Sequence, residues 1–151
     1  MPYVVLFFVT RKAGMSPAAF KNHFETSHIP LMQSLTGPHF PKTHVRRYIQ
    51  RSDGNPSSTD LGVSYANYPA TILVGTEADF EFDAIAELLF DDKAASDEFF
   101  KLINAKEALE TRVKEEEMFL DRSKIKAIVV GDVITTAGAA GTTGPVATES
   151  A

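Results

Sequence analysis

The order of extended and helical segments is the feature of this sequence that most restricts its fold. Residues 3–10 form a continuous apolar run rich in Val and Phe, which is typical of a strand buried on both faces. Further along, the pattern continues with helix, strand, strand, helix and strand. This order predicts an α+β, ferredoxin-like β-α-β-β-α-β subunit with a four-stranded sheet and both helices on one face.

The first helix is predicted from its start signal and its spacing. Ser16 is a good N-cap, and the proline that follows it stands at the first helical position, where no hydrogen bond is lost. Phe20, Phe24 and His28 follow at intervals of four and therefore share one face, which carries His28 toward the interior. Pro30 is expected to limit this helix, because the residue before a proline avoids the α region.

The later elements are expected as strands at 43–51, 82–90 and 124–135, a helical region at 91–117 and a long loop at 52–67. In the second strand, His44, Arg46 and Tyr48 alternate onto one face, which indicates a polar cavity or an interface rather than a dry core. The acidic run Glu115–Glu117 is expected to be a solvated helix face.

One domain and one tail are expected. Residues 1–135 carry the strand and helix patterns, and a chain of 151 residues has the usual length of a single domain. Residues 136–151 are rich in Ala, Gly and Thr and have almost nothing to bury, which predicts a flexible tail. Because both helices would cover the same sheet face, the other face needs a cover, and a second copy of the chain predicts a homodimer.

Charge and composition argue against several classes of partner. The net charge of −5 disfavours nucleic acid and anionic membrane surfaces, which select basic patches. No run approaches about 18 apolar residues, so no membrane span is expected. The absence of cysteine excludes disulfides, thiolate metal sites and cysteine nucleophiles, and it fits the reducing cytoplasm, which is the expected location.

No cofactor and no metal are expected from the motifs. The sequence has no phosphate loop and no dinucleotide-binding fingerprint. His23 and His28 lie five residues apart, which would rotate them by about 140° around an α-helix, so we expect them not to share a face or bind one metal.

Three segments of the chain resemble the EthD family. The most specific is FFVTRKAGMSP at 7–17, followed by Phe20 and by HIPL at 28–31. Residues 82–92 resemble the third strand of that family, and 115–121 resemble the acidic stretch before its last strand. The resemblance spans roughly residues 3–134 and implies a dimeric α/β-barrel built from ferredoxin-like subunits.

The resemblance also implies an activity. The long loop followed by YPA at 68–70 and LVGT at 73–76 is similar to a fungal branch of the family, which includes decarboxylases of anthrone-type carboxylic acids. This implies a cofactor-free lyase of aromatic polyketide biosynthesis that uses a histidine as general acid or base, since histidine titrates near neutral pH.

His28 is then the expected proton donor, with His44 and Asp83 as the other catalytic candidates. Asp83 or Asp121 could orient a histidine, as a carboxylate does for an imidazole. The side chains expected to bind a small aromatic polyketide substrate are Arg46, Tyr48, Tyr68, Glu87 and Phe24.

Other interpretations remain open. His28 could be a helix-capping or core histidine, the polar strand could face a dimer partner, and Asp83 and Glu87 could pair with arginines of the second strand. At the level of function, the alternatives are a polyketide cyclase or dehydratase, a cofactor-free oxygenase, and a non-catalytic binding or accessory protein. The last predicts a closed interior without a ligand-sized cavity beside His28.

Overall fold

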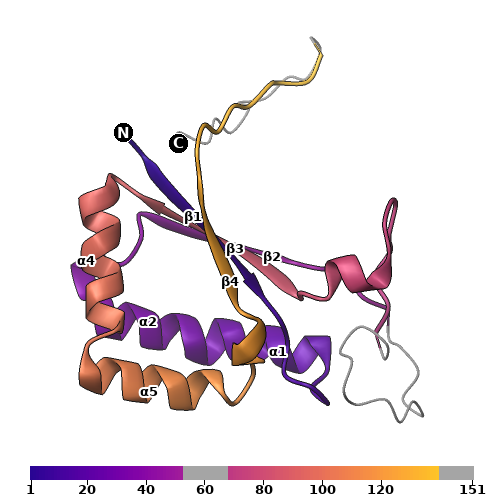
Figure 1. Ribbon diagram of the computed structural model, residues 1–151, viewed down its shortest axis with the longest axis horizontal. Coiled ribbons are helices and arrows are strands. Elements are labelled where there is room, and N and C mark those ends of the chain that lie inside the picture. The colour runs from indigo at the N-terminus through magenta and orange to yellow at the C-terminus, as the bar shows by residue number, and fades with distance from the viewer. Residues whose placement is uncertain (53–67, 140–151) are drawn as a thin grey trace.

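The four strands form one antiparallel sheet. A computed structural model of the chain describes residues 1–52 and 68–139. The strands are β1 (Tyr3–Val9), β2 (Thr43–Tyr48), β3 (Ala84–Phe90) and β4 (Lys126–Val130), in the order β2-β3-β1-β4 (Figure 1). This is the ferredoxin-like arrangement, so the expected α+β class and element order are confirmed. β2 and β4 end earlier than the sequence patterns suggested, and β3 begins two residues later.

The helices lie on one side of this sheet (Figure 1). They are α1 (Pro17–His23), α2 (Ile29–Thr36), α4 (Lys93–Ile103) and α5 (Lys106–Glu116), with a π-helical turn, η1 (Phe24–His28), between α1 and α2. Short 3₁₀ turns are η2 (Gly37–His39), η3 (Glu77–Phe80) and η4 (Arg122–Lys124). The predicted helical region at 91–117 is therefore two helices.

The first helix begins as predicted but does not end at Pro30. The Ser16 side chain accepts a hydrogen bond from the backbone N–H of Ala19 and caps α1. In η1, the N–H of Ile29 bonds to the carbonyl of Phe24, an i→i+5 bond that widens the helix by one residue. Pro30 follows this turn after one residue and occupies the first turn of α2, where a proline is tolerated. The helix therefore continues to Thr36, and the expected stop at Pro30 is wrong.

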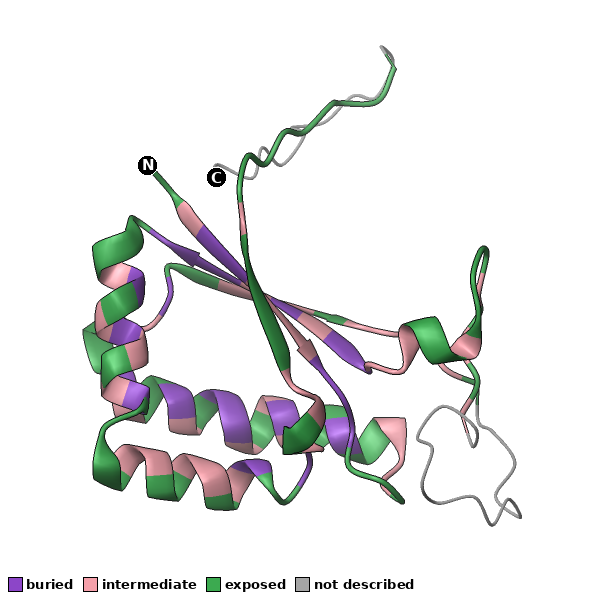
Figure 2. Cartoon of the chain, in the orientation of Figure 1, coloured by how far each residue is buried: buried purple, intermediate pink, exposed green. Residues whose placement is uncertain are grey.

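The core lies between the helices and the sheet (Figure 2). One buried cluster includes Met32, Leu88 and Phe99, and a second includes Phe24 and Phe119. Alternate residues of β3 point into these clusters, as the strand pattern predicted. The inner faces of β1 and β3 and the apolar sides of the helices therefore enclose one interior space.

The opposite side of the sheet is open at its β4 edge. Most of β4 is exposed (Figure 2), and the Ile128 side chain is 60% exposed. Among the described residues, no helix covers this face. Residues 131–139 continue beyond β4 without a helix or strand, while 53–67, in the predicted loop, and 140–151, in the predicted tail, lie outside the described residues. Within 1–52 and 68–139, no helix is both long and apolar enough to cross a membrane.

Candidate functional site

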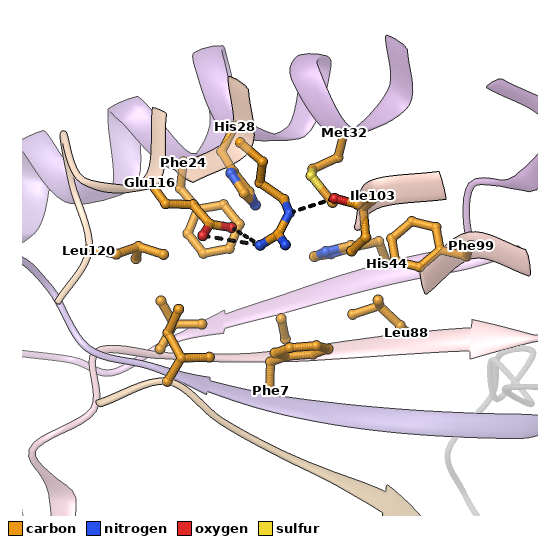
Figure 3. Close-up of a pocket in the computed structure, with 14 residues that line it drawn as sticks. Phe7, Phe24, His28, Met32, His44, Leu88, Phe99, Ile103, Glu116 and Leu120 are labelled. Atoms are coloured by element: carbon orange, nitrogen blue, oxygen red, sulfur yellow. Dashed lines mark hydrogen bonds and ion pairs between the residues drawn. The ribbon is translucent and has the colours of Figure 1, made fainter. Parts of the chain in front are cut away.

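A cavity of about 100 Å³, partly open to solvent, lies between the helices and the sheet, where the two buried clusters meet (Figure 3). Ten apolar side chains and four polar ones line it. The polar ones are His28, His44, Arg112 and Glu116. Among the described residues, no three His, Asp or Glu side chains group as metal ligands. The polar lining therefore offers proton donors and acceptors within an apolar space.

His28 is fixed by a carboxylate from α5. Its Nδ1 lies 2.6 Å from Oε1 of Glu115, and both side chains are 11% exposed. Because an ionised carboxylate can only accept hydrogen bonds, His28 Nδ1 carries the donating proton. Since Glu115 does not line the cavity and His28 does, Nε2 is the imidazole nitrogen left for a molecule in the cavity. His28 therefore lines a pocket at the end of the first helical segment, as expected, while its role there stays a prediction.

Glu115 also binds His23. Its Oε2 accepts from His23 Nε2 at 2.7 Å. The expectation that His23 and His28 point apart, as residues five apart do in an α-helix, is wrong. The π turn between them has i→i+5 hydrogen bonding, which brings residues five apart onto the same side. Both imidazoles also pack on the ring of Phe119, at centroid distances of 4.5 and 5.2 Å.

The acidic run at the end of α5 is not a solvated face, contrary to the sequence-based prediction. Burial raises the pKa of Glu115, but the hydrogen bonds from His28 and His23 outweigh it and hold this pKa below its usual value. Glu116 is buried and is bound by Arg112 and Arg122, and only Glu117 is exposed. A signal was present in the sequence, since carboxylates at a helix C-terminus are unfavourable unless a cation holds them.

His44 lies on β2 and also lines the cavity. Burial lowers its pKa to about 4, and the nearby charges of Arg46 and His28 add to this effect. His44 is therefore neutral at pH 7. The Arg46 guanidinium donates to His44 Nδ1 at 3.1 Å, so this nitrogen is an acceptor and Nε2 carries the proton. The two histidines of the cavity thus differ, with His44 a neutral donor and His28 paired with a carboxylate.

Arg46 and Tyr48 bind Glu25 of η1 rather than lining the cavity. The Glu25 carboxylate accepts two hydrogen bonds from Arg46, at 2.5 and 2.8 Å, and one from the Tyr48 hydroxyl at 2.5 Å. The hydrogen bond from Arg46 lowers the pKa of Glu25, while burial raises the pKa of Tyr48. These side chains join β2 to η1 and hold His44 in place, so any contact with a substrate would be indirect.

Three other predicted site residues lie away from the cavity. Asp83 accepts from the Arg11 backbone N–H at 2.8 Å and from Arg51 Nε at 2.7 Å, and the Tyr68 ring packs on the Arg11 guanidinium. Glu87 faces Arg47 on the open side of the sheet, at 3.9 Å. Asp83 and Glu87 thus pair with arginines from the 43–51 segment, as the structural alternative proposed.

The carboxylate that orients a histidine is therefore neither Asp83 nor Asp121. Asp121 bonds to the backbone and side chain of Ser123 at the start of η4. Glu115 is the carboxylate that orients His28, and it was not among the site residues predicted from the sequence. Of the predicted substrate-binding residues, Phe24 does line the cavity.

Comparison with known proteins identifies the family of this chain. The family model for the EthD domain matches residues 12–123. The chain belongs to the EthD family. A search of curated proteins found no match. A crystal structure of a protein from Arabidopsis thaliana is similar to this EthD chain at 14% identity and a TM-score of 0.52, covering 89% of this chain and 99% of that one. This likeness supports the fold alone.

A second solved structure carries the family name. It is an ethyl tert-butyl ether D (EthD) family protein from Bacillus halodurans, with 14% identity, a TM-score of 0.46 and coverage of 88% of this chain and 99% of that chain. The family of this EthD protein is established by the match to residues 12–123.

Protonation of His44 is expected to destabilise this EthD protein in mild acid. The His44 pKa is about 4 in the folded protein and about 6.5 when unfolded, so stability is lost as the pH falls from about 6.5 to 4. Between pH 7 and 5 this corresponds to about 2 kcal/mol of unfolding free energy. In urea unfolding, the free energy of unfolding of His44→Gln should fall less between pH 7 and 5 than that of the wild type. His39→Gln, which changes an exposed histidine, is the control and should keep the wild-type pH dependence.

Proposed function

We propose that this protein is a cofactor-independent lyase that decarboxylates an aromatic polyketide acid, with His28 as the general acid. One observation carries the proposal: His28 is held at Nδ1 by Glu115 while its Nε2 is left for an otherwise mostly apolar cavity. A histidine oriented by a carboxylate and supplied with a cavity is suited to move a proton to or from a bound molecule. Membership of the EthD family is consistent with this and does not specify the reaction.

The proposed reaction uses one proton from the enzyme. The bond between the ring carbon and the carboxylate breaks, carbon dioxide leaves, and the electron pair stays on the ring carbon. Protonated His28 then gives its Nε2 proton to that carbon, which leaves neutral imidazole and the decarboxylated product. Glu115 stabilises the protonated imidazole before this transfer, as a buried carboxylate does for other catalytic histidines.

His44 has a different part in this proposal. Because it is neutral and its Nδ1 accepts from Arg46, its Nε2–H can donate to a phenol or keto oxygen of the substrate. Such a donor stabilises negative charge that develops on that oxygen while carbon dioxide departs. The two histidines then have different roles in the reaction, since His28 gives the proton and His44 donates a hydrogen bond to the substrate oxygen.

The size of the cavity limits the substrate. A volume of about 100 Å³ is smaller than the roughly 300–1,000 Å³ of common ligand pockets. An anthrone acid has three fused rings and needs a wider cavity than this. Met32 lines the cavity, and methionine is the apolar side chain that most easily changes shape to accommodate a ligand. The proposal therefore includes widening of the cavity when a tricyclic acid binds.

The small volume of the cavity favours a second candidate, a non-catalytic binding or accessory protein. A small, mostly apolar cavity suits a protein that does not turn over a large ligand. A cyclase or dehydratase would use the same histidines and is separated from a decarboxylase only by its product.

The test is to incubate the purified protein with an anthrone carboxylic acid and with single-ring ortho-phenolic acids. The proposal expects the product mass to fall by one carbon dioxide, with gas release and no oxygen uptake. Loss of one water instead would establish cyclisation or dehydration. Binding of an acid without any product would support the accessory protein and contradict the lyase.

We also propose that the active form is a homodimer in which the two open sheet faces meet. The exposed fraction of Ile128 on β4 supports this, since contiguous apolar surface on a sheet requires a cover. Light scattering after gel filtration should give twice the chain mass, and Ile128→Lys should give the monomer mass. Met118→Lys, which changes an equally exposed apolar side chain in the segment between α5 and η4, should remain a dimer. A monomeric wild type would contradict the proposal.

A further inference from the structure

We propose that His23 is a positioning residue that sets the protonation of His28 by sharing one carboxylate, Glu115, with it. The inference rests on the proposed function in one respect, since it concerns the proposed general acid. It adds a residue that the sequence pattern excluded from the site.

The contacts place His23 and His28 in equivalent positions around Glu115. His28 Nδ1 reaches Oε1 at 2.6 Å, and His23 Nε2 reaches Oε2 at 2.7 Å. The Ser27 hydroxyl adds a longer bond of 3.4 Å to Oε2. Both oxygens of the carboxylate are therefore occupied by histidine N–H groups.

The two histidines differ in what lies beyond them. His28 lines the cavity, and His23 does not. The His23 side chain is 18% exposed, against 11% for His28. His23 therefore has greater contact with solvent than His28 has.

One negative charge then faces two groups that can each become positive. With one proton added, the His23–Glu115–His28 group is neutral. With a second proton, two imidazolium ions share a single carboxylate, and the two like charges repel within one hydrogen-bonded group. A like charge at this range shifts a proton equilibrium by about one pH unit or more. Protonation of His23 therefore opposes protonation of His28.

The other charged groups near His28 come from two elements. His44 lies on β2 with Arg46 beside it, and Arg112 and Glu116 of α5 line the same cavity. Glu116 pairs with Arg112 at 3.1 Å and with Arg122 at 3.0 Å, and neutral His44 carries no charge at pH 7. Within the described part of the chain, no hydrogen bond or ion pair joins any of these groups to His23, so a change at His23 leaves them in place.

The test is a proton NMR titration that follows the ring signal of His28 in the full-length protein. In the wild type we expect two coupled steps, because the two imidazoles share one carboxylate. In His23→Gln, which keeps a hydrogen-bond donor to Glu115 and removes the charge, we expect one step with its midpoint about one pH unit higher. The exposed-site control His39→Gln should reproduce the wild-type curve.

A folded His23→Gln protein whose His28 titration is unchanged would overturn the inference. If that variant fails to fold, His23→Asn is titrated instead with the same criterion. Where decarboxylation is found, its loss of rate at high pH should also move upward by the same amount, because His28 stays protonated longer. The NMR result decides the inference even if no acid is turned over, so its failure and failure of the proposed activity are distinct outcomes.

Discussion

Replacing His28 with alanine should lower the rate of decarboxylation by roughly 10²–10⁴-fold, the usual contribution of a positioned general acid. The variant removes the one imidazole that is both bound to Glu115 and open to the cavity. Glu115 then keeps its hydrogen bond from His23, so its charge is not left without a partner. The measurement is initial rate of product formation at saturating substrate, with thermal unfolding to show that the variant is folded.

His39→Ala is the matched control, because it removes an exposed histidine from η2 and leaves the cavity intact. It should have the wild-type rate. A folded His28→Ala protein that retains most of the wild-type rate would exclude His28 as the acid, and the proposed mechanism with it.

Replacing Asp83 with alanine should lower the free energy of unfolding by about 3–5 kcal/mol, the usual cost of removing one partner from a buried ion pair. The Asp83 side chain is 3% exposed, and those of Arg11 and Arg51 are 2% and 0% exposed. Asp83 also accepts the backbone N–H of Arg11, two residues after the end of β1. The substitution leaves both guanidinium groups buried without this carboxylate. Urea unfolding at pH 7 measures the difference.

The control is Asp97→Ala, which breaks a solvent-exposed ion pair with Lys93 on α4. Exposed pairs contribute little, so the unfolding midpoint should hardly move. Asp83→Asn should fall between the wild type and Asp83→Ala, since an amide keeps one acceptor oxygen and loses the charge. Equal stability of Asp83→Ala and the wild type would show that the Arg11–Asp83–Arg51 contacts are not structural.

The order of elements and the direction of His28 could be predicted because both depend on short-range patterns. Alternation in β3 and spacing by four in the first helix are local properties, and the structure keeps both. The orienting carboxylate could not be predicted in the same way. Glu115 lies 87 residues from His28 in the chain, and packing of α5 against η1 brings them together.

The structural role of Asp83 also could not be predicted from the sequence. Its position at the start of a strand, close to basic residues, is compatible with a catalytic or a structural carboxylate, and sequence has no means to choose. The contacts of Arg11 and Arg51 with Asp83 come from segments 72 and 32 residues away. Only the folded arrangement shows that these charges compensate one another rather than face the cavity.

The π turn at Phe24–His28 amounts to one extra residue inside an otherwise continuous helix. Deleting Thr26, the exposed residue of this turn, should restore plain α-helical hydrogen bonding between α1 and α2. His23 and His28 would then lie four residues apart, and residues four apart share one face of an α-helix. Because five residues of the wide turn cover about the same rotation as four residues of an α-helix, Phe20 should keep its place in the core and His23 its contact with Glu115. A relative with one residue fewer at this point would therefore hold two histidines on one carboxylate at a spacing of four instead of five.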